Sequence, residues 1–344
     1  MIIIMKPRVS QGEIDAVVGQ VERAGYRTHL STGEERTIIG VIGNDRSLPT
    51  QMFELMSGVE RVVSILKPYK LASRDFQPSD TVVPIDGVAI GANKIVVMAG
   101  PCSVEDRAQL METAWAVKQA GVHILRGGAF KPRTSPYAFQ GLGEEALELL
   151  AEAREATGLA IITEVMAPED VPLVARYADI LQIGARSMQN FALLHAAGRS
   201  GKPVMVKRSM MATLEELLLS AEYVLSHDNY RVMLCERGIR TFETETRFTL
   251  DLAGMAAAKL ETHLPVIADP SHATGTHKLV PPMALAALAG GADGLMIEMH
   301  PHPDRALSDG PQSLTPKRLR ALMDQIRTLT QALGLHLAEP APRG

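Results

Sequence analysis

The sequence has few of the features that mark disulfide-stabilised, nucleic-acid-binding or membrane proteins. Only two cysteines, Cys102 and Cys235, occur in 344 residues, too few for a disulfide framework, so we expect a protein of the reducing cytoplasm. Aromatic residues make up 4% of the chain, which argues against a stacking surface for nucleic acid. The formal net charge is −4, so no overall positive field attracts nucleic acid or an anionic membrane.

Long hydrophobic runs are also lacking. No apolar run approaches the roughly 20 residues of a membrane span, so we expect no association with a membrane. The apolar start, residues 1–7, is too short for a signal-peptide core and has no basic lead-in. Hydrophobic residues nevertheless make up 46% of the chain, enough for one large α/β domain and a second, small one.

Residues 1–66 predict a small α+β domain. The segments expected as strand, helix, strand, strand, helix and strand are 1–5, 10–24, 26–31, 37–42, 49–56 and 59–66. The order βαββαβ is that of a ferredoxin-like fold. Ser10 and Glu13 form the pattern of a capping box at the start of the first helix. Residues 67–80 are expected to form a linker.

Residues 81–338 show a different rhythm, in which short apolar runs alternate with amphipathic helical stretches. After an expected hairpin around 82–90, eight such runs occur at 95–99, 122–125, 160–163, 180–183, 204–206, 231–234, 266–268 and 294–297. Strands that alternate with helices indicate parallel βαβ units, and eight units favour a closed (β/α)8 barrel. An open doubly wound sheet is the structural alternative.

Polar side chains follow every predicted barrel strand, where the active sites of such barrels lie. The cations among them are Arg126, Lys131, Arg133, Arg186, Lys207 and Arg237. At one mouth they would repel one another unless anions neutralised them, and the arginine fork suits phosphate and carboxylate. Because six cations exceed the need of one phosphate, we expect at least two anionic groups, on one substrate or two.

A second set of strand-end residues could bind a metal. The candidates are Cys102, His272, Glu298 and Asp309. Closure of the barrel would bring the first and last strands together, and a mixed thiolate, imidazole and carboxylate set suits Mn, Fe, Co or Zn better than Mg or Ca. Spacing alone leaves alternatives open: a lone cysteine is often a small buried hydrophobe, and His300 and His302 are rival ligands.

Four long motifs lie in these strand-end loops. They are Ala99-Gly100-Pro101-Cys102-Ser103-Val104-Glu105, Gly127-Gly128-Ala129-Phe130-Lys131-Pro132-Arg133-Thr134-Ser135, Gly184-Ala185-Arg186 and Asp269-Pro270-Ser271-His272. Together they resemble 3-deoxy-D-arabino-heptulosonate 7-phosphate (DAHP) synthase, most closely its type I beta subgroup. The resemblance covers the whole barrel, and residues 1–66 resemble an extension found on some members. It implies the condensation of phosphoenolpyruvate with erythrose 4-phosphate, the first step of the shikimate pathway.

The resemblance also implies residue roles. A divalent metal, most simply Mn, would be held by Cys102, His272, Glu298 and Asp309. Phosphoenolpyruvate would be bound by Arg126, Lys131, Glu164, Ala185, Arg186, Lys207 and Arg237. The phosphate of erythrose 4-phosphate would be bound by Arg133, Thr134 and Ser135. The residues expected to take part in the chemistry are Lys131, as the proton donor, together with Cys102 and His272.

Three alternative functions share some of these features. The first is 3-deoxy-D-manno-octulosonate 8-phosphate synthase, which shares the barrel but typically has Lys-Ala-Asn where this chain has Lys131-Pro132-Arg133. The second is a phosphosugar-binding barrel without catalytic activity. The third is an aldolase that forms a Schiff base through Lys207. The arginines at the neighbouring strand ends favour a phosphate-binding role for Lys207 over this one.

The resemblance further implies regulation and assembly. In this subgroup such extensions can bind an aromatic amino acid, and His29 and Ser31 on the second predicted strand could contact tyrosine or phenylalanine. A homotetramer is expected. A further hypothesis is that Cys102 and Cys235 form a disulfide on oxidation. The favoured alternative is that Cys235 is a thiol packed in the core.

Overall fold

The structure is a computed structural model that describes residues 1–32, 36–42, 50–63, 67–91, 93–132 and 135–338. The chain divides into two compact units, Met1–Pro68 and Tyr69–Gly344. Each unit has its own hydrophobic core. Among the described residues, no helix combines the length and apolar character that crossing a bilayer requires.

The first unit has the predicted ferredoxin-like order. Its elements are β1 (Ile2–Met5), α1 (Gln11–Arg23), β2 (Arg27–Thr32), β3 (Thr37–Ile42), α2 (Thr50–Glu54) and β4 (Val59–Val63). The strands form an antiparallel sheet in the order β2-β3-β1-β4. The capping box of α1 is present, with the Ser10 hydroxyl accepting from the Glu13 amide at 3.4 Å. Ile14, Val17 and Val21 of this helix are buried in the core of the unit.

The second unit is a closed parallel barrel, so the prediction is confirmed and the open sheet is wrong. Its strands are β7 (Lys94–Gly100), β8 (Ile124–Arg126), β9 (Ala160–Val165), β10 (Ile180–Ile183), β11 (Val204–Lys207), β12 (Val232–Glu236), β13 (Val266–Ala268) and β14 (Gly294–Glu298). Each end lies within two residues of its predicted position. The pairing of β14 with β7 closes the barrel, and a short strand, β15 (His336–Leu337), adds to the outside of β7.

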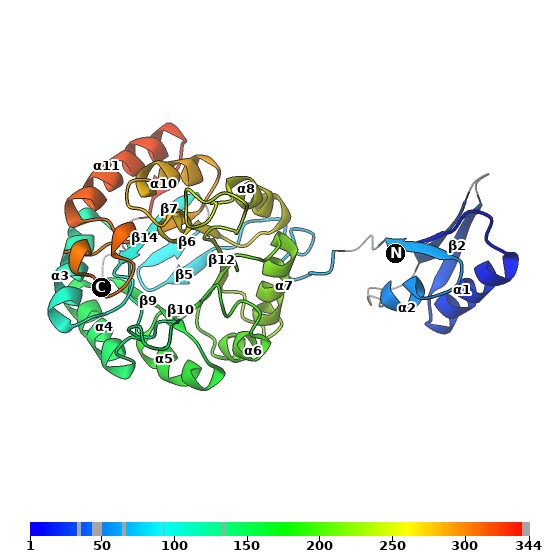
Figure 1. The fold of residues 1–344 in the computed structure, drawn as a ribbon, viewed down its shortest axis with the longest axis horizontal. Coiled ribbons are helices and arrows are strands. Elements are labelled where there is room, and N and C mark those ends of the chain that lie inside the picture. The colour runs from blue at the N-terminus through cyan, green and yellow to red at the C-terminus, as the bar shows by residue number, and fades with distance from the viewer. Residues whose placement is uncertain (33–35, 43–49, 64–66, 92, 133–134, 339–344) are drawn as a thin grey trace. The chain divides into compact units, whose positions relative to one another are not determined.

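Helices surround the barrel as an outer ring (Figure 1). They are α3 (Arg107–Ala120), α4 (Glu144–Thr157), α5 (Val171–Tyr177), α6 (Phe191–Arg199), α7 (Leu214–Leu225), α8 (Leu252–Glu261), α10 (Val280–Ala289) and α11 (Pro316–Ala332), and a short helix, α9 (Pro270–Thr274), follows β13. Local sequence sets their limits. Thr213 and Glu216 form a capping box at the start of α7, and Gly121 ends α3 in the left-handed conformation at φ 84°.

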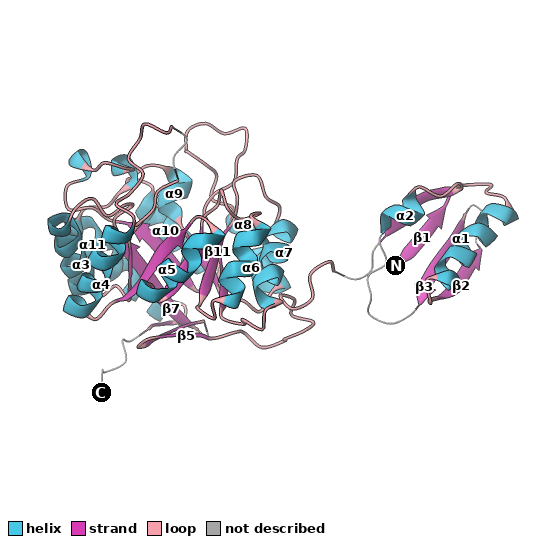
Figure 2. Cartoon of the chain, turned by 90° about the horizontal axis from the view of Figure 1, so that it is seen from below, coloured by secondary structure: helices cyan, strands magenta, loops and turns pink. Residues whose placement is uncertain are grey.

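One end of the barrel is closed by a hairpin of β5 (Val83–Ile85) and β6 (Val88–Ile90). Its side chains share a buried cluster with inward-facing residues of the strands, including Val96 and Ile267. Figure 2 shows the hairpin at the end of the barrel opposite the long loops. Because the hairpin fills this end, the space for a site lies at the carboxyl ends of the strands.

The stretch after the first unit differs from the linker expected over 67–80. From Tyr69 onward the chain belongs to the barrel unit. The carboxylate of Glu222 on α7 accepts hydrogen bonds from the backbone amides of residues 70–72 at 2.8 to 3.0 Å. Three donors on one carboxylate fix the backbone of this segment, and hydrophobicity patterns do not reveal such a contact.

A buried histidine contacts both ends of the same segment. His263 is 1% exposed. Its Nε2 lies 2.7 Å from the Leu71 carbonyl oxygen, and its Nδ1 lies 2.6 Å from the Thr81 hydroxyl. Both ring nitrogens therefore have a partner in the segment 69–81, which we call the strap.

We expect residues 67–344 to fold without the first unit, because the barrel cores consist of residues from Tyr69 onward. A chain that starts at residue 82 lacks the strap and leaves His263 and Glu222 without these partners. Its unfolding midpoint should lie on the order of 5–10 °C lower than that of 67–344, for a loss of about 2–3 kcal/mol. Thermal unfolding followed by circular dichroism measures this, and equal midpoints would contradict a stabilising strap.

Candidate active site

The mouth of the barrel holds a cavity of about 300 Å³. The cations that line it are Arg126, Lys131, Arg186, Lys207, Arg237 and Arg247. The first five were predicted from the strand ends, whereas Arg247 comes from the middle of the β12–α8 loop and was missed. Arg133 and Thr134 lie outside the described residues, and Ser135 lines the cavity.

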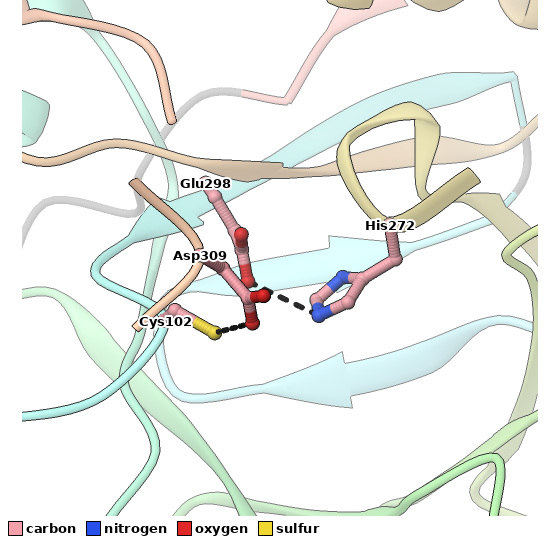
Figure 3. A group of neighbouring side chains, drawn as sticks. All are labelled: Cys102, His272, Glu298 and Asp309. Carbon is pink, nitrogen blue, oxygen red and sulfur yellow. Dashed lines mark hydrogen bonds and ion pairs between the residues drawn. The ribbon is translucent and has the colours of Figure 1, made fainter. Parts of the chain in front are cut away.

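The four predicted metal ligands come together at one side of the mouth. Cys102 follows β7, His272 lies in α9, Glu298 ends β14 and Asp309 lies in the loop after it. Figure 3 shows the four side chains pointing toward one another, and their ligand atoms all lie within 4.8 Å of one another. Bonds of about 2.0–2.3 Å to a shared ion would place the ligand atoms roughly 3.5 Å apart, so the cluster fits a metal after small side-chain movements.

Contacts within the cluster match this interpretation. The Cys102 thiol donates to Asp309 Oδ2 at 3.0 Å, and His272 Nε2 lies 3.1 Å from Glu298 Oε1. The rival ligands lie elsewhere, because His300 Nε2 faces Glu105 at 3.4 Å. His300 Nδ1 in turn accepts from the backbone amide of His302 at 3.0 Å. Thiol, imidazole and two carboxylates suit a borderline divalent ion.

Asp269, which lies in one of the four sequence motifs without an assigned role, is a buried acid that orients the histidine. Asp269 is 0% exposed. Its Oδ2 lies 2.7 Å from His272 Nδ1 and also pairs with Lys207. Burial opposes the charge on Asp269, but His272 and Lys207 outweigh it and hold the pKa of the carboxyl well below its usual value. A carboxylate on one ring nitrogen leaves the other to face the cluster, the arrangement typical of metal-binding histidines.

Protonation states follow from burial and charge. Burial, reinforced by Glu298, raises the pKa of the Cys102 thiol to about 12. Burial lowers the pKa of His272 to about 4. Burial also acts against both carboxylates, yet the nearby cations keep the pKa values of Glu298 and Asp309 below their ordinary values. Near neutral pH the cluster therefore has a thiol, a neutral imidazole and two carboxylates.

Two buried arginines that line the cavity each retain a buried donor without a partner among the described residues. Arg126 binds Glu298 at 3.0 Å and the Pro101 carbonyl at 2.8 Å, but its Nε has no hydrogen-bond partner among the described residues. The same holds for Nη1 of Arg237, whose guanidinium lies 4.5 Å from the centre of the Phe248 ring. Burial lowers the pKa of Arg237, and a bound anion would offset that penalty.

The Gly-Ala-Arg motif makes room for an acid at the cavity wall. Glu164, near the carboxyl end of β9, accepts a hydrogen bond from the side-chain amide of Gln182 at 2.9 Å. A side chain on Gly184 would place its Cβ 2.0 Å from Glu164 Oε1. Glycine at this position thus leaves the space that the Glu164 carboxylate occupies near Ala185 and Arg186, which also line the cavity.

Lys131 lies between the metal cluster and the cavity. Its ammonium contacts the Cys102 sulfur and lies 3.0 Å from Asp309 Oδ2. Burial acts against the charge, but Cys102, Glu298 and Asp309 raise the pKa of Lys131 above its ordinary value. Lys131 is thus an ammonium at neutral pH. Cys235, by contrast, is fully buried in the barrel interior, and both cysteines are free thiols.

Known protein families match both units. A model of the DAHP synthetase I family matches residues 50–334, and one of the DAHP synthase ferredoxin-like domain matches residues 1–67. The chain belongs to the DAHP synthetase I family. Its members are metal-dependent enzymes, and residues 1–67 correspond to a domain that the family is known to carry.

Individual relatives agree with this membership. A phospho-2-dehydro-3-deoxyheptonate aldolase of Thermotoga maritima is 50% identical over 335 residues, 97% of this chain and 99% of its own length. The crystal structure of a DAHP synthase from that organism superimposes with a TM-score of 0.95 over 98% of both chains. A 2-dehydro-3-deoxyphosphooctonate aldolase of Nitratidesulfovibrio vulgaris is 34% identical and matches 68% of this chain. Because the match to the heptonate enzyme covers nearly all of both chains, it favours DAHP synthesis over 3-deoxy-D-manno-octulosonate 8-phosphate synthesis.

We expect metal binding to release one proton. Only Cys102, with its pKa raised to about 12, must lose a proton to become a ligand, because His272 with a pKa of about 4 is already neutral. The apparent affinity for Mn²⁺ should therefore rise about tenfold per pH unit between about pH 6 and pH 8. Competition with a chelating dye measures the slope. The Cys102→Ser variant should lose it, and a pH-independent affinity of the unaltered protein would reassign the ligand.

Proposed function

We propose that the barrel mouth condenses phosphoenolpyruvate with D-erythrose 4-phosphate and water, giving DAHP and inorganic phosphate. This is the family's reaction, the first step of the shikimate pathway. One observation carries the proposal: a cavity lined by six cations, two of them buried arginines with an unpaired donor, also includes three members of the four-ligand cluster in its wall. Two anionic substrates beside a polarising metal require this combination.

The cations divide into two groups around phosphoenolpyruvate. We assign its phosphate to Arg186, Lys207 and Arg237, with Ala185 beside them. Its carboxylate is assigned to Arg126 and Lys131, with Glu164 near the reacting carbons. The unused Arg237 Nη1 supports the phosphate pocket, and the unused Arg126 Nε supports the carboxylate pocket. Holding both anionic groups fixes the enol carbon toward the second substrate.

The second substrate is assigned to the loop after β8. Arg133, Thr134 and Ser135 would bind the phosphate of erythrose 4-phosphate, and Ser135 is the described member of this set at the cavity. The aldehyde end then points inward, toward Lys131. An arginine at position 133 suits a four-carbon aldose phosphate, whereas a longer sugar would carry its phosphate farther out.

Residues of the chain handle charge and protons during the reaction. A divalent metal held by Cys102, His272, Glu298 and Asp309, which we propose to be Mn, would supply Lewis-acid polarisation of the aldehyde. C3 of phosphoenolpyruvate forms a bond to the aldehyde carbon, and the ammonium of Lys131 donates its proton to the new alkoxide. Water adds at C2, which the attack leaves electron-deficient, and one of its protons replaces the proton that Lys131 gave up. The C2–O bond to phosphate then breaks with its electron pair on phosphate, and the C2 hydroxyl becomes the ketone as its proton passes to the released phosphate.

Mixing the enzyme and Mn²⁺ with phosphoenolpyruvate and one aldose phosphate tests the function. Loss of the enol absorbance should be fast with erythrose 4-phosphate and at least about tenfold slower with arabinose 5-phosphate, because the clamp fits the shorter sugar. A demetallated sample is the control, and Mn²⁺ should restore its activity. Preference for arabinose 5-phosphate would overturn the assignment, and full activity after stringent demetallation would remove the metal from it.

We further propose that the first unit regulates the barrel by binding tyrosine or phenylalanine. His29 and Ser31 lie two residues apart on β2, so both side chains project from one face of the sheet. Both are exposed. Opposite His29, Gly40 of β3 leaves space that a side chain would take.

The regulatory proposal predicts inhibition by millimolar tyrosine or phenylalanine in steady-state assays. His29→Ala should weaken the inhibition about tenfold or more by removing a ligand contact, while the uninhibited rate stays unchanged. A chain of residues 67–344 should be catalytically active, and neither tyrosine nor phenylalanine should inhibit it. The absence of any response of the full chain to either amino acid would end the regulatory proposal.

We propose a homotetramer, as the family resemblance implies, and light scattering of the full chain measures it. The two free thiols, Cys102 and Cys235, suit the reducing cytoplasm.

A further inference from the structure

Arg247 has no part in the roles assigned so far, yet it contacts the metal cluster. It lies on the loop between β12 and α8 and lines the cavity. Its Nη1 lies 3.3 Å from Oδ1 of Asp309, the oxygen that the Cys102 thiol does not use. The same nitrogen donates to the Gln312 side-chain carbonyl at 3.0 Å.

Gln312 extends this contact to a second ligand. Its side chain is buried, at 2% exposure. The amide nitrogen donates to Glu298 Oε2, while the carbonyl oxygen accepts from Arg247. Both ends of the amide are therefore used, and Arg247, Gln312 and Glu298 form a chain that leaves Glu298 Oε1 directed at His272.

The backbone around Arg247 is tied to the segment that carries a third ligand. The Phe248 amide donates to the Ala273 carbonyl at 2.7 Å, and the Arg247 amide donates to the Thr274 carbonyl at 3.2 Å. Both acceptors lie in α9, which holds His272. Gly275 ends this helix at φ 71°, and a side chain there would place its Cβ 2.7 Å from Arg247 Cβ.

Asp309 depends on such support because its backbone is strained. Its φ is 53°, in the left-handed region that non-glycine residues adopt at a cost of about 1–2 kcal/mol. The described contacts that hold it include Arg247 on Oδ1 and the Ser313 hydroxyl, which donates to its carbonyl at 3.2 Å. Lys131 and the Cys102 thiol hold Oδ2 of the same carboxylate, so the described side-chain contact that loss of Arg247 removes is the one on Oδ1.

We propose that Arg247 and Gln312 are positioning residues of the metal centre, which hold Asp309 and Glu298 in a ligating arrangement. Arg247 is the residue at which the segments of three ligands meet: Asp309 directly, Glu298 through Gln312, and His272 through the backbone of α9. Contacts behind the ligands typically change metal affinity by about 10- to 100-fold. The inference rests on the proposed four-ligand site.

Metal affinity of the full-length, demetallated protein tests the inference directly. Competition between the protein and a chelating dye gives the dissociation constant for Mn²⁺. Arg247→Gln and Gln312→Met should each weaken binding about tenfold or more. The double variant should be little weaker than the worse single variant, because both act through one chain of contacts. Arg240→Gln is the matched control, since Arg240 is an exposed arginine of the same loop, and it should stay within about twofold of the unaltered protein.

A spectroscopic readout separates positioning from general damage. Co²⁺ bound to the unaltered protein should show ligand-field and thiolate charge-transfer bands, and Arg247→Gln should shift their positions or intensities while Arg240→Gln does not. Arg247→Lys keeps the charge without the planar fork and should also weaken Mn²⁺ binding. It replaces Arg247→Gln if that variant fails to fold, as judged by thermal unfolding.

Two results would overturn the inference. One is a Mn²⁺ dissociation constant within about twofold of the unaltered value in folded Arg247 and Gln312 variants. The other is an unchanged Mn²⁺ affinity with about tenfold weaker binding of phosphoenolpyruvate to Arg247→Gln, which would make Arg247 a substrate ligand. Cys102→Ala distinguishes this failure from that of the proposed site. If Cys102→Ala also leaves Mn²⁺ affinity unchanged, the ligand set itself is wrong.

Discussion

The hydrogen-bond ladder between β7 and β14 joins the first and last strands of the barrel, and the site is built on it. Glu298 lies opposite Gly100 in this register, and Cys102 follows two residues later. Residues almost 200 positions apart in the chain thereby become neighbours in one metal cluster. The ladder also sets where the loop after β14 starts, and thus where Asp309 returns to the mouth. A shift of one residue would turn Glu298 away from the interior, because neighbouring side chains of a strand face opposite sides.

Buried acids neutralise part of the positive charge at the mouth of the barrel. Buried cations such as Lys207 and Arg126 are paired with buried acids, Asp269 and Glu298 respectively. Removal of one partner leaves the other charge buried without compensation in a low dielectric, which lowers the free energy of unfolding. The unused donors of Arg237 and Arg126 lie inside this paired framework. The paired framework can therefore be stable without substrate, while the cations that line the cavity still attract anions.

The sequence predicted the fold well because burial leaves a local signature. Each barrel strand is a run of buried apolar residues, so the strands and the polar residues at their ends could be found without any contact information. Spacing did not decide the metal ligands, which depended on family motifs and on closure of the barrel. Asp269, Gln312 and Arg247 were missed as supporting residues because their roles depend on loop paths and on partners far along the chain. The strap was expected to be a linker for the same reason, since the carboxylate of Glu222 that holds it lies about 150 residues away.

The hairpin β5–β6 has a consequence for how ligands move. Because it fills one end of the barrel, the mouth is the single route through which both substrates arrive and both products depart in the described structure. The pocket assigned to phosphoenolpyruvate includes the buried side chains of Arg126 and Lys207, whereas Ser135 of the assigned aldose-phosphate clamp is exposed. A ligand at the assigned outer position would therefore lie between the solvent and the assigned inner position. If the two substrates occupy the assigned positions, this geometry predicts that phosphoenolpyruvate binds before erythrose 4-phosphate.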